Sequence, residues 1–295
     1  MNKDNKHLLN FGGLEAEYSD YRKSRISIVP VPYDLTTTYI SGTSKGPNAI
    51  IEASQHMELY DEELEKETYR VGIHTREPLP VATESPENML RIVSDAVSSD
   101  IESEKFQVML GGEHSISLGM VRELKKKYPD VSVLHLDAHA DLRTSYEGTP
   151  YNHACIGRRM SELCPLVQVG VRSWSTEEAD YKRNSPVLTI TDYEVRGNKK
   201  WIDKVISSLT SEVYLTFDLD VLDPAIMPAV GTPEPGGLHW HDAIAFLRLL
   251  SQKKRIVSCD LVELAPQPGN VAPDFLAAKL AYRIMGYIAE AEGWM

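Results

Sequence analysis

The sequence is poor in cysteine, in positive charge and in long apolar runs, and each shortage excludes a class of protein. Its 295 residues include only three cysteines, Cys155, Cys164 and Cys259. Their odd number and their spacing match neither a zinc knuckle nor a redox pair, so we expect a reduced, cytoplasmic setting. The thiols are interpreted as small buried hydrophobic groups.

Acidic residues outnumber basic ones, which gives a formal net charge of −12. This balance argues against general binding of nucleic acid, which requires a basic face. It suits a small cationic substrate, although solubility alone is the simpler reason for an acidic protein. No apolar run approaches the length of a membrane span, and the N-terminal MNKDNKHLLN lacks the apolar core of a signal peptide. We therefore expect no membrane partner.

Short apolar runs alternate with amphipathic segments along the whole chain, and we find no internal repeat or linker. Strands are expected at Arg25–Val29, Phe106–Leu110, Val131–Leu136, Leu166–Val169, Val187–Thr189, Val213–Phe217 and Ile256–Leu261. Helices are expected at Asn48–Ser54 after Pro47, Glu87–Ser99, Ser117–Lys127, Glu177–Arg183, Lys200–Ser208, His241–Leu250 and Pro273–Glu290. Such alternation predicts an α/β fold with a mainly parallel sheet and helices on both faces. Because the candidate site spreads over residues 114–220, we expect residues 1–295 to form one domain.

The segment His135–Arg143, HLDAHADLR, is the strongest indication of function. Asp137, His139 and Asp141 follow an apolar run at every second position, and alternation puts such residues on one face. Two carboxylates and an imidazole that converge at a strand end favour a divalent metal site, because repulsion between the like charges otherwise has no compensation.

Two further segments bring the same residue types to strand ends. In TFDLDVLDP, Asp218 and Asp220 follow another apolar run. In GGEHSI, His114 follows a strand and a glycine turn. Ligands of open parallel sheets gather at the carboxyl ends of the strands, so we expect four Asp and two His side chains to meet there.

The charge of this set favours two metal ions. Four carboxylates are balanced by two divalent cations, since the two imidazoles are neutral when they ligate a metal. Oxygen-rich ligation with two imidazoles favours Mn²⁺ over structural Zn²⁺, although Co²⁺, Fe²⁺ or Ni²⁺ also fit. Two such ions about 3.5 Å apart can deprotonate one shared water, which predicts a hydrolase.

Other polar residues near these segments have less specific interpretations. Asp223 is interpreted as a turn former, His135 as a buried, hydrogen-bonded residue, and Glu113 as a residue that supports a neighbour. His153, in YNHACIGRR, is a candidate proton shuttle near the metal site. Glu263, in SCDLVELAP, is a further strand-end carboxylate.

Together these motifs resemble the ureohydrolase family, which includes arginase and agmatinase. GGEHSI, HLDAHADLR, TFDLDVLDP and DLVELAP occur in the order of that family, and the resemblance extends from VPYDLTTTYISGTSKGPNAI to the last helix. It implies a three-layer α/β/α sandwich around a parallel eight-stranded sheet, two Mn²⁺ per chain, and assembly into trimers or hexamers. The ligands that it implies are His114, Asp137, His139, Asp141, Asp218 and Asp220.

The resemblance also implies roles for three residues. A metal-bridging hydroxide would attack the guanidinium carbon of a small cationic substrate, and urea and an amine would leave. Asp141 would hydrogen-bond the hydroxide and handle its proton, Glu263 would hold the planar guanidinium, and His153 would pass a proton to the leaving amine.

Among guanidino substrates the sequence favours agmatine, which would yield putrescine and urea. Arginase-like chains place an Asn two positions after the DAHxD motif, whereas this chain has Arg143 there, and the loop Gly231–Gly237, GTPEPGG, also resembles agmatinases. The remote amine is expected to contact Gly170–Glu178 or Tyr146. Aminopropyl-agmatine, guanidinobutyrate and arginine stay open, because Arg143 could attract a carboxylate.

Two other classes of protein fit the residues less well. Metal-dependent deacetylases of the related fold use one metal and lack the first-strand histidine that His114 supplies here. A non-catalytic homologue would have lost metal ligands, and all six are present in this sequence.

Overall fold

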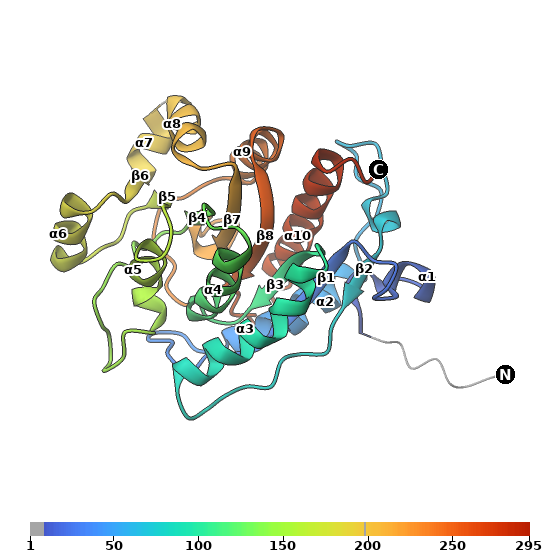
Figure 1. The fold of residues 1–295 in the computed structure, drawn as a ribbon, viewed down its shortest axis with the longest axis horizontal. Helices are drawn as coiled ribbons and strands as arrows, with labels where there is room; N and C mark the ends of the chain where they lie inside the picture. The colour runs from blue at the N-terminus through green and yellow to red at the C-terminus, as the bar shows by residue number, and fades with distance from the viewer. Residues whose placement is uncertain (1–8, 198) are drawn as a thin grey trace.

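One parallel sheet of eight strands forms the centre of residues 9–197 and 199–295, which the computed structural model describes (Figure 1). The strands are β1 (Ile26–Val31), β2 (Ile73–Thr75), β3 (Phe106–Gly111), β4 (Ser132–Leu136), β5 (Leu166–Val171), β6 (Leu188–Thr191), β7 (Glu212–Asp218) and β8 (Arg255–Val262). Their order across the sheet is β2-β1-β3-β8-β7-β4-β5-β6. The predicted parallel eight-stranded sheet is confirmed.

Helices cover both faces of this sheet (Figure 1). On one face α2 (Gly46–Ser54) and α9 (Trp240–Lys253) pack against α10 (Ala272–Ala291), and on the other α3 (Pro86–Glu102) pairs with α4 (Ser117–Lys127). The remaining helices are α1 (Ala16–Ser19), α5 (Ile156–Ser161), α6 (Thr176–Asn184), α7 (Asp192–Gly197) and α8 (Lys200–Ser208). This arrangement is the three-layer α/β/α sandwich expected from the sequence.

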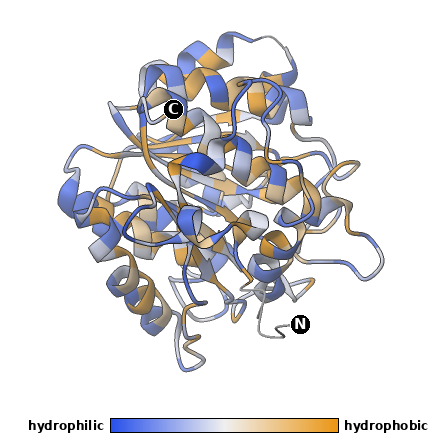
Figure 2. Cartoon of the chain, turned by 90° about the vertical axis from the view of Figure 1, so that its right-hand side faces the viewer, coloured by the Kyte–Doolittle hydropathy of each residue, from blue (hydrophilic) through white to orange (hydrophobic). Residues whose placement is uncertain are grey.

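The strands divide their side chains between two hydrophobic cores. In β1, Ile26 and Ile28 belong to the core under α2 and α10, whereas Val29 and Val31 belong to the core under α3 and α4. Because both faces are covered, the strands are buried along nearly their whole length, although β4, β7 and β8 include polar residues. Figure 2 shows the result, with hydrophobic residues concentrated in the central strands and hydrophilic ones on outer helices and loops.

The differences from the predicted elements are confined to short segments. All seven predicted strands are present, but the pattern does not predict β2, which has three residues and lies at the edge of the sheet. The pattern also misses α1, α5 and α7, which span six residues or fewer. Segments of this length are too short to display a hydrophobic period. The seven predicted helices are all present, and Pro47 lies in the first turn of α2.

A buried ion-pair network joins α10 to the segment that precedes β2. The guanidinium of Arg283, a residue only 2% exposed, lies 2.8 Å from Asp61, 2.5 Å from Glu62 and 3.0 Å from Glu63. Tyr287, one turn further along α10, donates a hydrogen bond to Glu63 at 2.6 Å. The buried guanidinium of Arg283 is thus paired with the buried Asp61 and with the more exposed Glu62 and Glu63 of its own chain.

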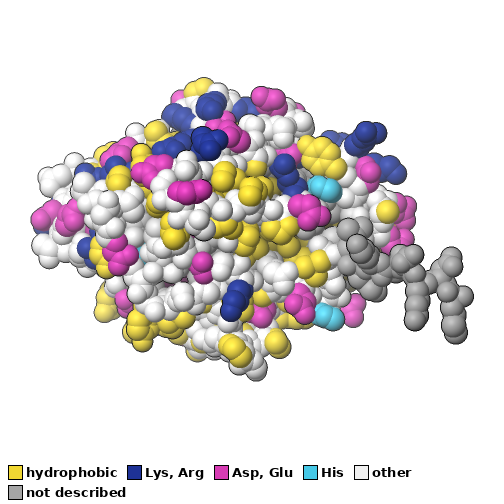
Figure 3. All heavy atoms as spheres, turned by 90° about the horizontal axis from the view of Figure 1, so that it is seen from below, with side chains coloured by type: hydrophobic (Ala, Val, Ile, Leu, Met, Phe, Trp, Pro, Cys, Tyr) yellow, Lys and Arg dark blue, Asp and Glu magenta, His cyan; other side chains and the backbone are white. Residues whose placement is uncertain are grey.

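The surface mixes charges of both signs. On the face shown in Figure 3, acidic and basic side chains lie close to each other with hydrophobic ones between them. This face therefore presents no uniformly charged area. None of the helices in the described part of the chain has the length and apolar character needed to cross a membrane.

The four strands at the middle of the sheet end at the same level. One row of paired residues crosses β3, β8, β7 and β4 and consists of Leu110, Leu261, Phe217 and Leu136. The segments that follow these strands contain GGEHSI, DLVELAP, TFDLDVLDP and HLDAHADLR. The strand order therefore brings four distant motifs to one edge of the sheet, where ligands of parallel sheets bind.

Candidate metal centre

Three aspartates after β4 and at the end of β7 divide their two oxygens between the backbone and the site. Oδ1 of Asp137 accepts the N–H of His139 at 2.5 Å. Oδ1 of Asp218 accepts the N–H of Asp220 at 2.8 Å, and Oδ1 of Asp220 accepts that of Ala138 at 3.0 Å. Their Oδ2 atoms face imidazole nitrogens. Oδ1 of each carboxylate is thus fixed by the backbone, and Oδ2 is available to bind a metal ion.

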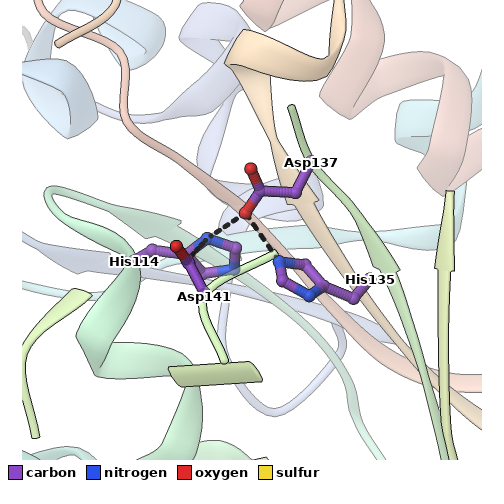
Figure 4. A group of neighbouring side chains, drawn as sticks. All are labelled: His114, His135, Asp137 and Asp141. Atoms are coloured by element: carbon purple, nitrogen blue, oxygen red, sulfur yellow. Dashed lines mark hydrogen bonds and ion pairs between the residues drawn. The ribbon is translucent and has the colours of Figure 1, made fainter. Parts of the chain in front are cut away.

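His114, just after β3, places its Nδ1 among three carboxylates. Oδ2 of Asp137 and Oδ2 of Asp218 each lie 3.1 Å from this nitrogen, and Oδ2 of Asp141 lies 3.7 Å away. Figure 4 shows Asp137 and Asp141 turned toward the His114 ring. The nitrogen is buried and has no hydrogen-bond partner of suitable geometry within the described residues. A nitrogen that faces several carboxylates without a hydrogen bond is typical of ligands arranged around a cation.

The other ring nitrogen of His114 is held by a buried hydroxyl group. Nε2 lies 2.8 Å from Oγ1 of Thr216, whose hydroxyl donates to Oδ1 of Asp260 at 2.7 Å. Thr216 therefore accepts a hydrogen bond from Nε2–H, which leaves the lone pair of His114 on Nδ1. Asp260 is fully buried and also accepts hydrogen bonds from Ser117 and Tyr214.

His135 lies beside this group but is not a further ligand. Its Nε2 is 2.6 Å from Oδ2 of Asp137, and the amide of Gln168 donates to its Nδ1 at 3.0 Å (Figure 4). Because Nδ1 accepts, Nε2 carries the hydrogen and donates it to Asp137. Burial lowers the pKa of His135, which keeps the ring neutral. The interpretation of His135 as a buried, hydrogen-bonded residue is confirmed.

His139 defines a second group of ligand atoms. Its Nδ1 lies 2.8 Å from Oδ2 of Asp220 and 3.6 Å from Oδ1 of Asp137. Asp137, His139 and Asp220 offer ligand atoms within 4.8 Å of one another. A second such group consists of His114, Asp137, Asp141 and His135, but both ring nitrogens of His135 have hydrogen-bond partners. Asp137 belongs to both groups, so two adjacent ions could share it.

The site attracts positive charge. Burial opposes protonation of His114, but its contacts with Asp137 and Asp218 raise its pKa well above the ordinary value. Burial is likewise outweighed at His139, whose pKa is raised by the carboxylate of Asp220. Burial and the neighbouring charge of Asp220 also raise the pKa of Asp218 well above its ordinary value. Each shift adds positive charge or removes negative charge, which is what a bound cation would do.

These residues fit a pair of divalent cations. The four aspartates have histidines as their ion-pair partners, and no Lys or Arg of residues 9–197 and 199–295 pairs with them. Carboxylates and imidazoles without thiolates suit Mn²⁺ or a similar ion better than structural zinc. The predicted ligands that the structure brings together are His114, Asp137, His139, Asp141, Asp218 and Asp220.

A pocket of about 250 Å³ opens onto this group and is lined by every predicted site residue except the buried Asp137. Asp141 and Glu263 both have positive φ angles, 53° and 69°, in the region that favours glycine. Glu263 is held there by two hydrogen bonds, from its N–H to the carbonyl of Gly112 and from the N–H of His114 to its Oε1. Burial raises the pKa of Glu263 to about 8. Strained backbone of this kind is commonly found at functional sites.

His153 begins a short 3-10 turn, His153–Cys155, and lines the same pocket. The side chain of Asn152 caps this turn by accepting the N–H of Ala154 at 2.9 Å. Burial lowers the pKa of His153 to about 4, so its imidazole is neutral near neutral pH. Its Nδ1 lies 3.3 Å from the hydroxyl oxygen of Thr36, in the loop that follows β1.

Aromatic side chains and one compensated arginine line the outer part of the pocket. The guanidinium of Arg143 lies 4.8 Å over the ring of Tyr146, and its Nε is 3.9 Å from the buried Glu178. Glu178 is fixed by the capping box of α6. Trp174 and Tyr39 also line the pocket and are 40% and 77% exposed. Both regions predicted to contact the remote end of the substrate therefore contribute to the pocket.

The remaining residues singled out in the sequence lie away from the site or form part of its support. Asp223 accepts the N–H of Ala225 at 2.9 Å, which confirms it as a turn former. Glu113 supports a neighbour, as expected, through hydrogen bonds to Thr36 and Ser115. The three cysteines are buried and unpaired, and His7 lies outside the described residues.

Thr36, Glu178 and Asp260 contribute to the site but do not stand out as functional in the sequence. Asp260 carries a detectable signal, because a charged residue inside an apolar strand must be hydrogen-bonded. Thr36 and Glu178 carry none, since they reach the site only through the path of two loops.

The chain is similar to several known proteins in sequence and in fold. A model of the Arginase family matches residues 24–286. The N(1)-aminopropylagmatine ureohydrolase of Synechocystis sp. is 41% identical over 95% of this chain and 94% of that protein. An agmatinase of Halalkalibacterium halodurans is 31% identical over 92% of this chain and 94% of that protein. The crystal structure of agmatine ureohydrolase of Thermoplasma volcanium, 33% identical, superposes with a TM-score of 0.86 over 94% of both chains.

Proposed function

The chain belongs to the arginase family, and from this premise we propose that its substrate is N1-aminopropylagmatine. As a ureohydrolase it cleaves a C–N bond of a guanidino group and releases urea; from this substrate the other product is the triamine spermidine. The relative named for this substrate is 41% identical, whereas the agmatinase is 31% identical. Agmatine, the substrate that the sequence motifs favour, is therefore the second candidate.

The pairing of Arg143 is the structural observation that favours a substrate without a carboxylate, a property that both candidates share. Its guanidinium lies against Tyr146 and near the carboxylate of Glu178, so its charge is already compensated. A substrate carboxylate would compete with Glu178 for it, which disfavours arginine and guanidinobutyrate. The exposed rings of Trp174 and Tyr39 suit a long polyamine arm, because methylene groups and ammonium ions both pack favourably on aromatic faces.

We assign the metal pair to the six predicted ligands, with Mn²⁺ as the proposed metal. When bound, two such ions supply the Lewis acidity that makes water a strong nucleophile near neutral pH. The chain prepares its ligands for them through hydrogen bonds. Thr216 holds Nε2–H of His114 so that Nδ1 presents its lone pair, and His135 donates to Asp137.

Three other roles concern substrate binding and proton transfer. Glu263 is the proposed partner of the substrate guanidinium, since a planar cation pairs well with a carboxylate. The positive charge of the guanidinium offsets the cost of burying the ionised Glu263. Asp141 is proposed to hold a proton at Oδ2, which faces the other ligands. His153, neutral near pH 7, is proposed to accept a proton in the pocket at one ring nitrogen and then pass it to the departing amine nitrogen.

The substrate proposal is tested by urea release from the purified chain loaded with Mn²⁺. Aminopropylagmatine, agmatine, arginine and guanidinobutyrate are compared at matched concentrations. We expect the highest kcat/KM for aminopropylagmatine. A higher value for agmatine would return the assignment to the second candidate, and a preference for arginine would contradict the role given to Arg143.

The role of His153 is tested by His153→Ala. We expect two metal ions per chain to be retained, because His153 makes no contact with the ligand oxygens, while kcat falls by roughly 10²-fold or more through loss of positioned proton transfer. Metal content by elemental analysis and kcat by urea release are the two measurements. Loss of metal would mean that His153 belongs to the metal centre instead.

A cytoplasmic setting and assembly into trimers or hexamers stay predictions. Light scattering of the purified protein tests the assembly. A mass of one or two chains would contradict it.

A further inference from the structure

The loop that follows β1 is bound tightly to the segment that precedes His114. The N–H of Gly112 donates to the carbonyl of Val31 at 2.9 Å, and the N–H of Glu113 donates to that of Tyr33 at 2.7 Å. A Cβ on Gly112 would lie 1.9 Å from the carbonyl oxygen of Tyr33, so only glycine permits this approach. The contact fixes the position of Thr36, which comes three residues after Tyr33.

The carboxylate of Glu113 is turned toward Thr36. Its Oε2 accepts the N–H of Thr36 at 2.5 Å, and its Oε1 accepts the hydroxyl of Thr36 at 2.6 Å and that of Ser115 at 2.5 Å. Glu113 is fully buried and Thr36 nearly so. Three donors on one buried carboxylate fix both the side chain of Thr36 and the direction in which its hydroxyl hydrogen points.

The oxygen of that hydroxyl also contacts His153 at two atoms. The N–H of His153 donates to it at 3.2 Å, and Nδ1 of the ring lies 3.3 Å from it. A hydroxyl has one hydrogen, and it is directed to Oε1 of Glu113 at 2.6 Å rather than to Nδ1 at 3.3 Å. Burial raises the pKa of Glu113 to about 7, and the hydrogen bonds from Ser115 and Thr36 act against that rise by favouring the carboxylate. Toward Nδ1, Thr36 is therefore an acceptor, which requires a hydrogen on Nδ1.

We propose that Thr36, oriented by Glu113, is a positioning residue that holds His153 in its Nδ1–H tautomer and leaves Nε2 as the nitrogen that exchanges protons in the pocket. The inference rests on the proposed role of His153. The two tautomers of a neutral imidazole are not equivalent, because only the nitrogen without hydrogen can accept a proton. A ring free to adopt the other tautomer, or to rotate, would spend part of its time unable to do so.

The test compares two substitutions of Thr36 in the Mn²⁺-loaded enzyme. Thr36→Val removes the hydroxyl at nearly constant volume, and we expect kcat for urea release to fall by roughly tenfold to a hundredfold. We expect KM to change by less than about twofold and metal content to stay constant, because binding is not affected. Thr36→Ser retains the hydroxyl and should restore most of the activity. Full activity in Thr36→Val overturns the proposal.

A matched control is available in the same region of the chain. Thr43 is fully buried, but its hydroxyl has no hydrogen-bond partner among the described residues, and it does not line the pocket. Thr43→Val therefore removes a threonine hydroxyl without removing a hydrogen bond. We expect its kcat to equal that of the unmodified enzyme. An equal loss in both valine variants would mean that Thr36 acts on the packing of the loop alone.

A double-mutant cycle tests whether Thr36 acts through His153. Substitutions that disable one functional unit are not additive, so Thr36→Val should cause no further loss of kcat in a His153→Ala background. A second, independent fall in kcat in the double variant contradicts the proposed route.

The tautomer itself can be measured without any substitution at Thr36. In protein with ¹⁵N-labelled histidine, nuclear magnetic resonance distinguishes a protonated from an unprotonated ring nitrogen, and the signals that vanish in His153→Ala identify His153. We expect hydrogen on Nδ1; hydrogen on Nε2 overturns the proposal even if Thr36→Val does not fold. Because this measurement needs no turnover, failure of the proposed ureohydrolase substrate would leave its result unaffected.

Discussion

Two groups of buried charges, one at the carboxyl edge of the sheet and one under α10, differ in how their charge is compensated. Under α10, Arg283 lies within 3.0 Å of three carboxylates of its own chain. At the carboxyl edge, four aspartates converge with two histidines and without Lys or Arg partners in the described chain. A buried charge must be neutralised or paired, and of these two groups only the one under α10 has an Arg of the same chain as its partner.

The difference separates stability from function. A charge set that is complete within the chain contributes to the folded state regardless of any ligand. An acidic set whose only ion-pair partners in the described chain are histidines is compensated by protons in part, and cations from outside should stabilise it further, so it indicates a binding site. The predictions that follow test this distinction, from the largest expected effect to the smallest.

The largest effect is expected from removal of a proposed ligand. His139→Ala or Asp218→Ala should lower metal content and activity together. We expect the loss of activity to exceed the roughly 10- to 100-fold that loss of an outer hydrogen-bond partner costs. Elemental analysis and urea release measure the two quantities. Full activity in a metal-depleted double variant would contradict the assignment of these ligands.

Unfolding measurements with chelator and with excess Mn²⁺ sharpen the same test. For the unmodified protein, added metal should raise the unfolding midpoint strongly, because it binds the folded chain. In Asp218→Asn this increase should shrink, while the midpoint in chelator stays equal or rises, since burial and the charge of Asp220 raise the pKa of Asp218 and make its ionised form unfavourable without metal. A lower midpoint in chelator would show that Asp218 stabilises the fold without metal.

Substitution of Arg283, in the charge group under α10, is expected to affect activity less and stability more than loss of a metal ligand. Arg283→Met leaves Asp61 buried without its cation and should lower the free energy of unfolding by about 3–5 kcal/mol. The decrease should be the same with chelator and with Mn²⁺, and the folded variant should keep its metal content and kcat. A decrease that depends on metal would mean that the two groups are coupled.

The smallest effect is expected at an exposed ion pair. Arg183 and Asp180 pair on the surface of α6, with side chains 66% and 58% exposed. Arg183→Ala should change the free energy of unfolding by less than about 1 kcal/mol, because solvent screens such pairs. Chemical denaturation measures this value beside that of Arg283→Met. A similar loss in both variants would remove the contrast between buried and exposed pairs.

Sequence patterns predict the parts of this fold that are long or chemically distinctive. The alternation of apolar runs and amphipathic segments predicts seven strands, and α4 and α8 have the bounds that periodicity predicts. The edge strand β2 is not predicted, because three residues are too few to show a hydrophobic period. The motifs after β3, β4 and β7 predict the ligand set because Asp and His side chains that converge at strand ends are typical of metal sites.

What the sequence could not supply is the support around those ligands. Thr36 contacts His153, which lies more than a hundred residues later in the sequence, and no local pattern encodes that contact. The positive φ angle of Glu263 is likewise held by tertiary hydrogen bonds rather than by local preference. The positive charge of Arg143 favoured a substrate with a carboxylate, but the carboxylate of Glu178 already lies near this guanidinium.

The strand order has a consequence for how such a protein can diverge. The proposed metal ligands and the guanidinium partner follow four adjacent strands, β3, β8, β7 and β4, while the edge strands β2 and β6 contribute none of them. Insertions or substitutions near the edge strands β2 and β6 can therefore accumulate without disturbing the hydrolytic chemistry. Changes in the loops that line the pocket can alter the substrate while the metal ligands stay the same. Membership of this family therefore predicts which bond is broken more securely than which substrate contains it.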